Sequence, residues 1–511
     1  MAHETSPSAA RRNSITSPAT ISSVGDGYSV NVRFIELQKE LRFVLSAGVT
    51  SLAPSRAASP DHEDLLQDQG LDLTTADGTA VATPSQRRSL LNSTKLPDGI
   101  SKLCVINYLK NWITECAPFL DKFDEKHHFG VQVPILAQHS PALLYAVLAF
   151  SARQIERKNA VEKSYDSLEL YQKSIRLLGP SLQAREASVL VTVCILACLE
   201  LMSGSPRDWK RHLEGCASLF GCFGVTGFSG KLLQAVFWCY ARMELCGVII
   251  SNSIEATVLP LEQWIPPMPS DYSPSDLTYR ERHESFAHHL FQKTSWNCPD
   301  MHANWAVYLC TKACDLICRR VRHLELGEQD DDKRPFATRW HYLWNELQFW
   351  LDHRPSELLP ITITEPSGNQ LFPEILYTHW AAISSNQLYH TACLILLDTT
   401  SLGRPDLTSL SSRITTSSHQ QQHSLSLTWH AKRVCGISLT NPHLGNLVNA
   451  IQPLYVAGRH LTHPEEHLAT GRLLKKIDLS TGWGALWRLR DLEAVWGYDQ
   501  GEILSAIKGS S

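Results

Sequence analysis

The sequence has no C-x2-C cysteine pair and no long apolar run. Nowhere do only two residues separate two cysteines, the spacing typical of zinc sites, and the first cysteine is Cys104. The 14 cysteines lie mostly within apolar helical patterns, which favours reduced thiols in a core over a disulfide framework. No run reaches the roughly 18 apolar residues of a membrane span, and the first residues lack the apolar core of a signal peptide. We therefore expect neither secretion nor membrane insertion.

The chain also lacks an excess of positive charge and the motifs of common enzymes. Its 47 Lys and Arg residues and 51 Asp and Glu residues give a formal net charge of −4, so it has no general attraction to nucleic acid. No G-x-S-x-G turn, Walker loop or dinucleotide fingerprint follows an expected strand. We therefore expect no catalytic residue, no metal, no cofactor and no enzyme activity. The 511 residues, 43% of them hydrophobic, are ample for a large core.

The first hundred residues differ in composition from the rest. Residues 1–100 are rich in Ser, Thr, Pro, Ala and Gly, so we expect most of this region to be disordered. One segment within it has apolar residues at helical spacing, at Phe34, Leu37, Leu41 and Val44. A helix that docks on its own domain is favoured here over a coiled coil, which needs three or four heptads.

Two polar segments interrupt the chain. Residues 61–77 contain acids and leucines but no Lys or Arg, which suits a solvated linker, with an activation sequence as the alternative. Residues 408–423 are rich in Ser, Thr and Gln and predict a loop.

Residues 187–251 are the stretch on which we expect the rest of the chain to pack. Residues 189–202 are apolar except for Thr192 and Glu200, which suits a helix buried on most of its faces. Ser205 is placed to cap a second helix. Four glycines between 221 and 230 predict the end of that helix and a loop before a third.

Helical spacing continues on both sides of this stretch. It predicts helices near residues 103–116, 141–157, 165–178, 301–326, 340–351 and 373–397, and two or three more before the end. Prolines within 264–269 predict an extended crossover, and acids at 330–332 predict an exposed turn. The expected fold class is all-α, with a helical domain over 101–500 and a C-terminal tail over 501–511.

The last predicted helix contains Trp483, Trp487 and Trp496, with Thr481 as its expected cap. Its apolar side, to which Val495 would contribute, is expected to dock on the core as a lid. Replacing Trp487 or Trp496 by alanine should then cost on the order of 3–5 kcal/mol. An exposed aromatic face for a partner protein is the alternative.

A cysteine stripe invites a metal interpretation. Cys310, Cys314 and Cys318 are spaced i, i+4, i+8, but helical rise separates the outer two by about 12 Å along the axis. One ion cannot bind all three, because metal–sulfur bonds are only about 2.3 Å long. A buried core stripe is favoured.

A short histidine motif suggests a zinc peptidase. His463-Pro-Glu-Glu-His467 matches the H-x-x-E-H pattern, in which two histidines bind zinc and Glu466 would act as base. Pro464 is expected to begin a helix, which leaves His463 at its cap and misaligns the two rings. The hydrolase remains a minor alternative.

Four long motifs indicate a family. They are DWKRHLEGCASLF, GFSGKLLQAVFWCYARMEL, NPHLGNLVNAIQPLYVAGRHLTHPEEH and TGWGALWRLRDLEAVWGY. Together they resemble the regulatory domain of fungal zinc-cluster transcription factors, in particular the ARCA-like branch, over about residues 103–498. The resemblance implies an all-helical regulatory domain.

That family binds DNA through six cysteines in two C-x2-C-x6-C groups, which this sequence lacks. The first hypothesis is therefore a nuclear regulator of RNA polymerase II transcription with little sequence-specific DNA binding of its own. It would work with transcriptional co-regulator proteins or a DNA-binding partner, and a pocket between helices could hold a small-molecule effector. Loss of a zinc-cluster exon from the gene model, the zinc hydrolase and a helical interaction scaffold are the alternatives.

Overall fold

The computed structural model describes residues 28–52, 101–159, 166–203, 209–252, 254–269, 278–399 and 425–509. Apart from one short hairpin, the regular structure in these ranges is helical, which confirms the expected all-α class. The first helices are α1 (Val32–Leu52), α3 (Lys102–Asn111), the π-helix η1 (Trp112–Cys116), α4 (Ala117–Leu120), α5 (Gln132–Ala137), α6 (Pro141–Asn159), α7 (Asp166–Ser181), the 3₁₀ turn η2 (Leu182–Ala184), α8 (Ala187–Ser203), α9 (Trp209–Phe223) and α10 (Lys231–Ile250).

The second half contains further helices and the hairpin. Its elements are η4 (Leu261–Gln263), α11 (Tyr279–Ser295), α12 (Pro299–Leu326), α13 (Phe336–Asp352), η5 (Ser356–Leu358), β1 (Thr362–Thr364), β2 (Glu374–Leu376), α14 (Trp380–Leu397), α17 (Leu427–Thr440), α18 (Leu444–Gly458), α19 (Pro464–Thr481), α20 (Leu486–Trp496) and α21 (Glu502–Gly509). The antiparallel strands pair Ile363 with Ile375.

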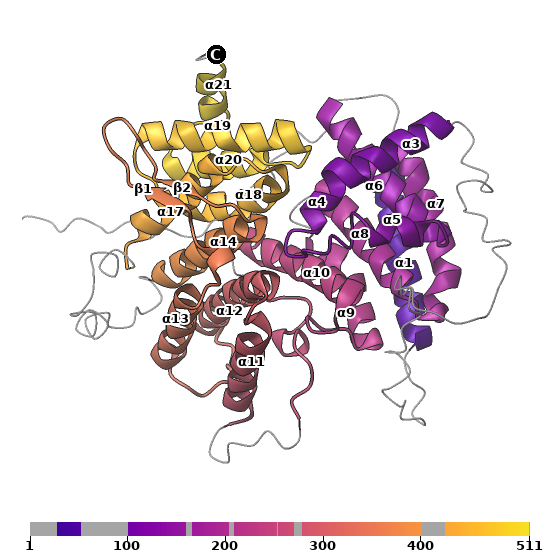
Figure 1. Ribbon diagram of the computed structural model, residues 1–511, viewed down its shortest axis with the longest axis horizontal. Helices are drawn as coiled ribbons and strands as arrows, with labels where there is room; N and C mark the ends of the chain where they lie inside the picture. The colour runs from indigo at the N-terminus through magenta and orange to yellow at the C-terminus, as the bar shows by residue number, and fades with distance from the viewer. Residues whose placement is uncertain are drawn as a thin grey trace, which may run out of the picture.

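Helix α10 joins the two halves of the molecule (Figure 1). It contacts α8 and α9 on one side and α12 and α18 on the other. Its length and composition would allow a membrane span, with a mean hydropathy of 1.3 over its most apolar window, but 78% of that window is buried. Helix α10 is therefore packed as a core helix.

The central stretch forms the three predicted helices, α8, α9 and α10. Nearly all of α8 is buried, and its acidic residue Glu200 accepts hydrogen bonds from Tyr171 and His212. Helix α9 runs through Gly221 to Phe223, so the first of the four glycines does not end it. The chain turns instead at Gly224 and Gly230, both at positive φ, where glycine is unstrained.

Helix α1 docks on its own domain, as its apolar spacing predicts. Phe34, Leu37 and Leu41 are buried, and α1 contacts α7 and α9. The fourth buried position is Leu45, whereas Val44 is only partly buried. At 100° per residue Leu45 returns to the face of Phe34, and Val44 does not.

Two predicted helices differ from the structure. In the helix predicted near 103–116, Leu103, Ile106 and Ile113 are exposed, while Val105 and Trp112 are buried, so apolar spacing does not identify its buried face. The α-helix α3 is also followed by the π-helix η1, whose i to i+5 bonds change the angular spacing of the residues after Asn111.

The helix predicted over 373–397 begins only at Trp380. Residues 374–376 instead form β2, which pairs with the preceding strand β1 in the hairpin. Beyond residue 500, where a tail was expected, α21 forms and contacts α19 through a face that includes the buried Ile503 and Ile507. The acidic segment 61–77, the cap at Ser205 and the loop 408–423 lie outside the described residues.

Candidate functional site

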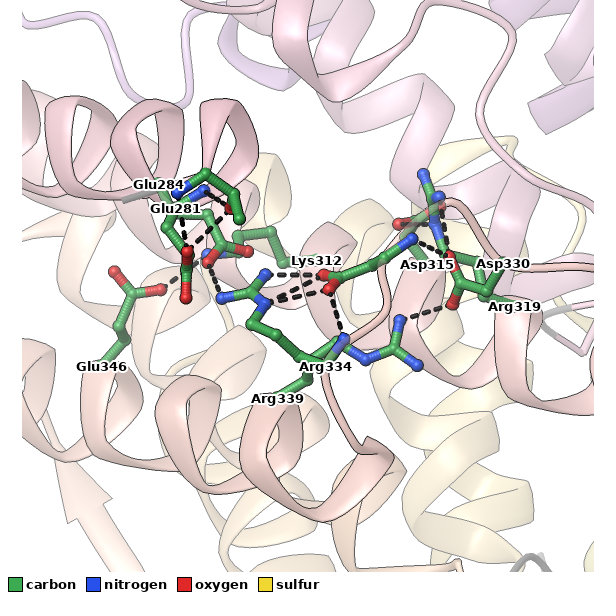
Figure 2. Close-up of polar contacts among 11 residues, drawn as sticks. Glu281, Glu284, Lys312, Asp315, Arg319, Asp330, Arg334, Arg339 and Glu346 are labelled. Carbon is green, nitrogen blue, oxygen red and sulfur yellow. Dashed lines mark hydrogen bonds and ion pairs between the residues drawn. The ribbon is translucent and has the colours of Figure 1, made fainter. Parts of the chain in front are cut away.

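Helices α11, α12 and α13 enclose a pocket of about 140 Å³. Its wall includes charged or polar side chains from all three helices: Arg280, Glu284, Lys312, Asp315, Arg339 and Tyr342. Cavities of roughly 150 Å³ hold a molecule the size of benzene. Figure 2 shows the ion pairs that these helices bring together at this place.

Local sequence signals set the bounds of the helices around the pocket. Helix α11 starts with a capping box, in which the Thr278 hydroxyl accepts from Glu281 N–H at 3.3 Å and the Glu281 carboxylate accepts from Thr278 N–H at 2.9 Å. Helix α12 ends at Gly327, whose φ of +67° suits glycine. The loop after Gly327 supplies acidic and basic side chains that bond to the pocket helices.

The loop side chains form ion pairs. Arg334 contacts Asp332 at 2.6 Å and Glu284 of α11 at 2.9 Å, and Arg339 of α13 pairs with Asp330. The turn is exposed at Asp331, as expected, whereas the side chains of Asp330 and Asp332 are only 12% and 6% exposed because they pair with arginines. Burial alone would raise the pKa of Asp332, but the hydrogen bonds from Arg334 outweigh it and lower the pKa to about 2.

A second group of ion pairs lies deeper. Lys312 Nζ of α12 lies 2.7 Å from Glu346 Oε2 of α13, and His288 Nδ1 of α11 lies 3.1 Å from Glu346 Oε1. Burial alone would raise the pKa of Glu346, but Lys312 and a hydrogen bond with His288 lower it below its usual value. Burial alone would lower the pKa of Lys312, and the charges of Glu346 and Glu284 raise it instead. Both partners are thus held in their charged forms.

The pocket wall combines charged and aromatic side chains. It offers both signs of charge, from Arg280 and Lys312 and from Glu284 and Asp315, beside tyrosine rings. No Ser, Thr or Cys is among the described residues that line it, so it lacks the usual nucleophiles of acyl transfer. Helices α11 and α12 each contribute one basic and one acidic side chain to the wall, Arg280 with Glu284 and Lys312 with Asp315. Sequence reasoning missed this site, because its ion pairs join residues far apart in the chain.

The cysteine stripe on α12 is part of the core. Cys310, Cys314 and Cys318 are at most 1% exposed. Their burial on one helix confirms the core interpretation that was favoured over a metal site.

The histidine motif does not form a metal-binding face. His463 precedes α19 and is exposed, while Glu466 is buried in an ion pair. Both ring nitrogens of His467 are engaged, Nδ1 with the Tyr498 hydroxyl at 3.2 Å and Nε2 with the Leu461 carbonyl at 3.1 Å. The two rings therefore do not meet at one ion, which removes the basis of the hydrolase alternative.

Helix α20 docks on the core through Leu489 and Leu492, as the lid prediction required. Trp496 is partly buried, stacks on His467 with ring centroids 4.1 Å apart and donates to the Gly458 carbonyl at 2.8 Å. Val495, which was expected to add to the apolar side, is 50% exposed.

Two other details of α20 differ from the expectation. Thr481 does not cap α20, because it is the last residue of α19 and its hydroxyl donates to a carbonyl of that helix. Arg488 is buried, and its guanidinium bonds to Gln452 at 2.7 Å and stacks on Tyr455 at 3.7 Å. This arginine ties α20 to α18 from inside the core.

Comparison with known proteins identifies the family of this chain. The profile of the fungal specific transcription factor domain matches residues 107–502. The chain is 21% identical to "Transcription activator AMTR1" of Alternaria alternata in an alignment 509 positions long, which covers 76% of this chain and 63% of that protein. No solved structure matches. Because the matched residues make up most of the chain, the protein belongs to the family defined by the fungal specific transcription factor domain.

Proposed function

We propose that this protein is a nuclear regulator of RNA polymerase II transcription whose helical domain responds to a small polar effector. The observation that supports the regulatory role is the match of residues 107–502 to a transcription factor domain. Residues 101–500 would form the regulatory domain, on which helix α1 of the N-terminal region packs. The name of the similar protein, a transcription activator, favours activation over repression.

The protein would reach promoters through other proteins. The printed sequence contains no C-x2-C pair and has a net charge of −4, so neither a zinc cluster nor a general attraction to phosphates supports DNA binding by this chain alone. We therefore infer that a DNA-binding partner places it at promoters and that co-regulator proteins transmit its effect.

The pocket between α11, α12 and α13 is the proposed effector site. Its walls present Arg280 and Lys312 near Glu284 and Asp315, which suits a zwitterion such as an amino acid or a small dipeptide. Binding there would join three helices, and α12 also contacts α10 and α14. An effector could thus alter how the two halves of the molecule pack.

A tethered reporter tests the regulatory role. The full chain is fused to a heterologous DNA-binding domain whose operator lies upstream of a reporter gene. The proposal predicts a severalfold change in expression relative to the DNA-binding domain alone. Unchanged expression with normal fusion-protein levels would favour the helical scaffold that has no role in transcription.

Thermal melting with a panel of amino acids and dipeptides tests the pocket. A ligand at 100 times its Kd stabilises the folded state by about 2.7 kcal/mol, so it should raise the Tm of the parent. The rise should be lost in Arg280→Ala, at the pocket wall, and kept in Arg472→Ala, on the exposed side of α19. A ligand that stabilises both variants equally binds elsewhere, and a panel without any stabilising member rejects this ligand class.

A further inference from the structure

Four sulfur atoms meet between α8 and α10. Cys194 and Cys198 are four residues apart on α8, and Cys239 and Met243 are four residues apart on α10, so each pair lies on one helix face. The three cysteine Sγ atoms all lie within 4.8 Å of one another. Cys198 Sγ also lies 3.2 Å from Met243 Sδ. Two helices thus bring three thiols together, with the thioether of Met243 beside one of them.

This geometry is close to that of a metal site. Three sulfur atoms bonded at about 2.3 Å to one central ion would lie about 4 Å apart, so these three need to approach by less than about 1 Å. The stripe of Cys310, Cys314 and Cys318 differs, because all three lie on one helix and spread along its axis. The α8–α10 cluster can reach a single ion because its cysteines come from two facing helices.

The ligand atoms indicate which metal would bind. All four are sulfur, and the four residues are 1%, 1%, 3% and 9% exposed in sequence order, so water is excluded. Structural zinc normally takes four Cys, His or carboxylate ligands, and the fourth atom here is a thioether, which suits the softer Cu(I). We propose that Cys194, Cys198 and Cys239 bind one Cu(I) ion, with Met243 as a weaker fourth ligand.

The charges can balance in the buried site. Binding of Cu(I) with release of two thiol protons leaves two thiolates, one neutral thiol and one net negative charge. Arg242 is buried and lies next to Cys239, where its positive charge offsets that negative charge. The bound ion would cross-link α8 to α10, the helix that joins the two halves of the molecule.

The test is an anaerobic titration of the reduced full-length chain. Cu(I) is supplied as its complex with a chromophoric chelator, and Zn(II) is supplied in parallel with a zinc chelator. We expect the chain to remove one equivalent of Cu(I) with a sulfur-to-copper charge-transfer band in the ultraviolet. We expect no equivalent uptake of Zn(II).

Matched double variants assign the site. Cys194→Ser/Cys239→Ser should lose the bound copper, and Cys310→Ser/Cys314→Ser, which also removes two buried thiols, should keep it. If the first variant does not fold, Met243→Leu keeps the core volume and should weaken Cu(I) binding by on the order of 10-fold. Copper retained in Cys194→Ser/Cys239→Ser, preferential uptake of Zn(II), or a disulfide in place of metal binding would overturn the proposal.

Discussion

The ammonium group of Lys312 lies 2.7 Å from the carboxylate of Glu346, and the two side chains are only 12% and 6% exposed. The pair joins the middle of α12 to α13, and Lys312 also lines the charged pocket. Tyr342 also donates to Glu346 at 3.5 Å, and the charge of Glu284 acts on Lys312. The polar groups of the pocket are therefore supported by partners from each surrounding helix.

Breaking this ion pair on one side should destabilise the protein. In Lys312→Met the carboxylate of Glu346 stays buried without its main partner, which typically costs about 3–5 kcal/mol. Urea denaturation followed by circular dichroism measures the loss. The double variant Lys312→Met/Glu346→Leu is the control and should recover most of the stability, because no buried charge remains. A double variant as unstable as the single one would show that packing, rather than charge, causes the effect.

The same pair gives a stability that depends on pH. The folded-state pKa of Glu346 is lowered, so its contribution is present above its ordinary pKa of 4.5 and is lost as the pH falls through the folded-state pKa. The pKa of Lys312 is raised, so its contribution is present below its ordinary pKa of 10.5 and is lost as the pH rises through the folded-state pKa. The Tm of the parent minus the Tm of the double variant should be constant from about pH 6 to about pH 9. This difference should become smaller as the pH falls below about 4.5. A constant difference down to about pH 3 would contradict this.

Two helical glycines should respond oppositely to alanine. An added Cβ at Gly247 would lie 2.1 Å from the Trp209 ring, whereas at Gly221 the nearest atom, from Gln263, is 3.9 Å away. Gly247→Ala should therefore destabilise by about 1–3 kcal/mol through overpacking of α9 against α10. Gly221→Ala should be neutral or stabilise by up to about 1 kcal/mol, because alanine is the better helix former. Equal Tm values for the two variants would show that α9 and α10 pack less closely.

The two tryptophans of α20 should contribute unequally. Trp496 reaches another helix through its contacts with His467 and Gly458, so Trp496→Ala should cost on the order of 3 kcal/mol. Trp487 donates only to Gly484, three residues before it, and stacks on Arg488, so Trp487→Ala should cost less than the 3–5 kcal/mol expected from the sequence. Thermal melting ranks the two variants. Parent-like melting of both, together with loss of a co-regulator in pull-down, would show that the aromatic face is a docking site.

The purified chain should bind duplex DNA weakly and without sequence preference. Its net charge of −4 and the lack of a zinc cluster in this sequence leave few sources of affinity. Gel shifts at physiological salt with promoter and scrambled duplexes provide the measurement. Salt-resistant binding that selects one duplex would contradict this prediction and would point to a DNA-binding surface within the helical fold.

The local parts of the fold could be predicted from the sequence, and the non-local parts could not. Apolar periodicity placed α8, α10 and α12, because each is long and mostly buried. It missed the delayed start of α14, because the hairpin of β1 and β2 takes residues 374–376 out of the predicted helix. It also missed the buried face of α3, where Leu103 and Ile106 are exposed and Val105 is buried.

The candidate sites could not be predicted from the sequence, because residues far apart in the chain form them. The pocket ion pairs join Glu284 to Arg334 and Lys312 to Glu346, residues that no local pattern connects. The sulfur cluster has one sequence signal, the i, i+4 pair of Cys194 and Cys198, but its third cysteine comes from another helix. Family resemblance supplied the regulatory role, which neither composition nor periodicity could indicate.

The most direct test of the central claim is chromatin immunoprecipitation of the tagged full-length protein expressed in a fungal cell. A regulator recruited by a DNA-binding partner should be nuclear and enriched several-fold at a defined set of promoters over an untagged control. Genes at those promoters should change expression when the protein is removed. Absence of promoter enrichment, with the protein present and stable, would contradict the assignment of this chain as a transcription regulator.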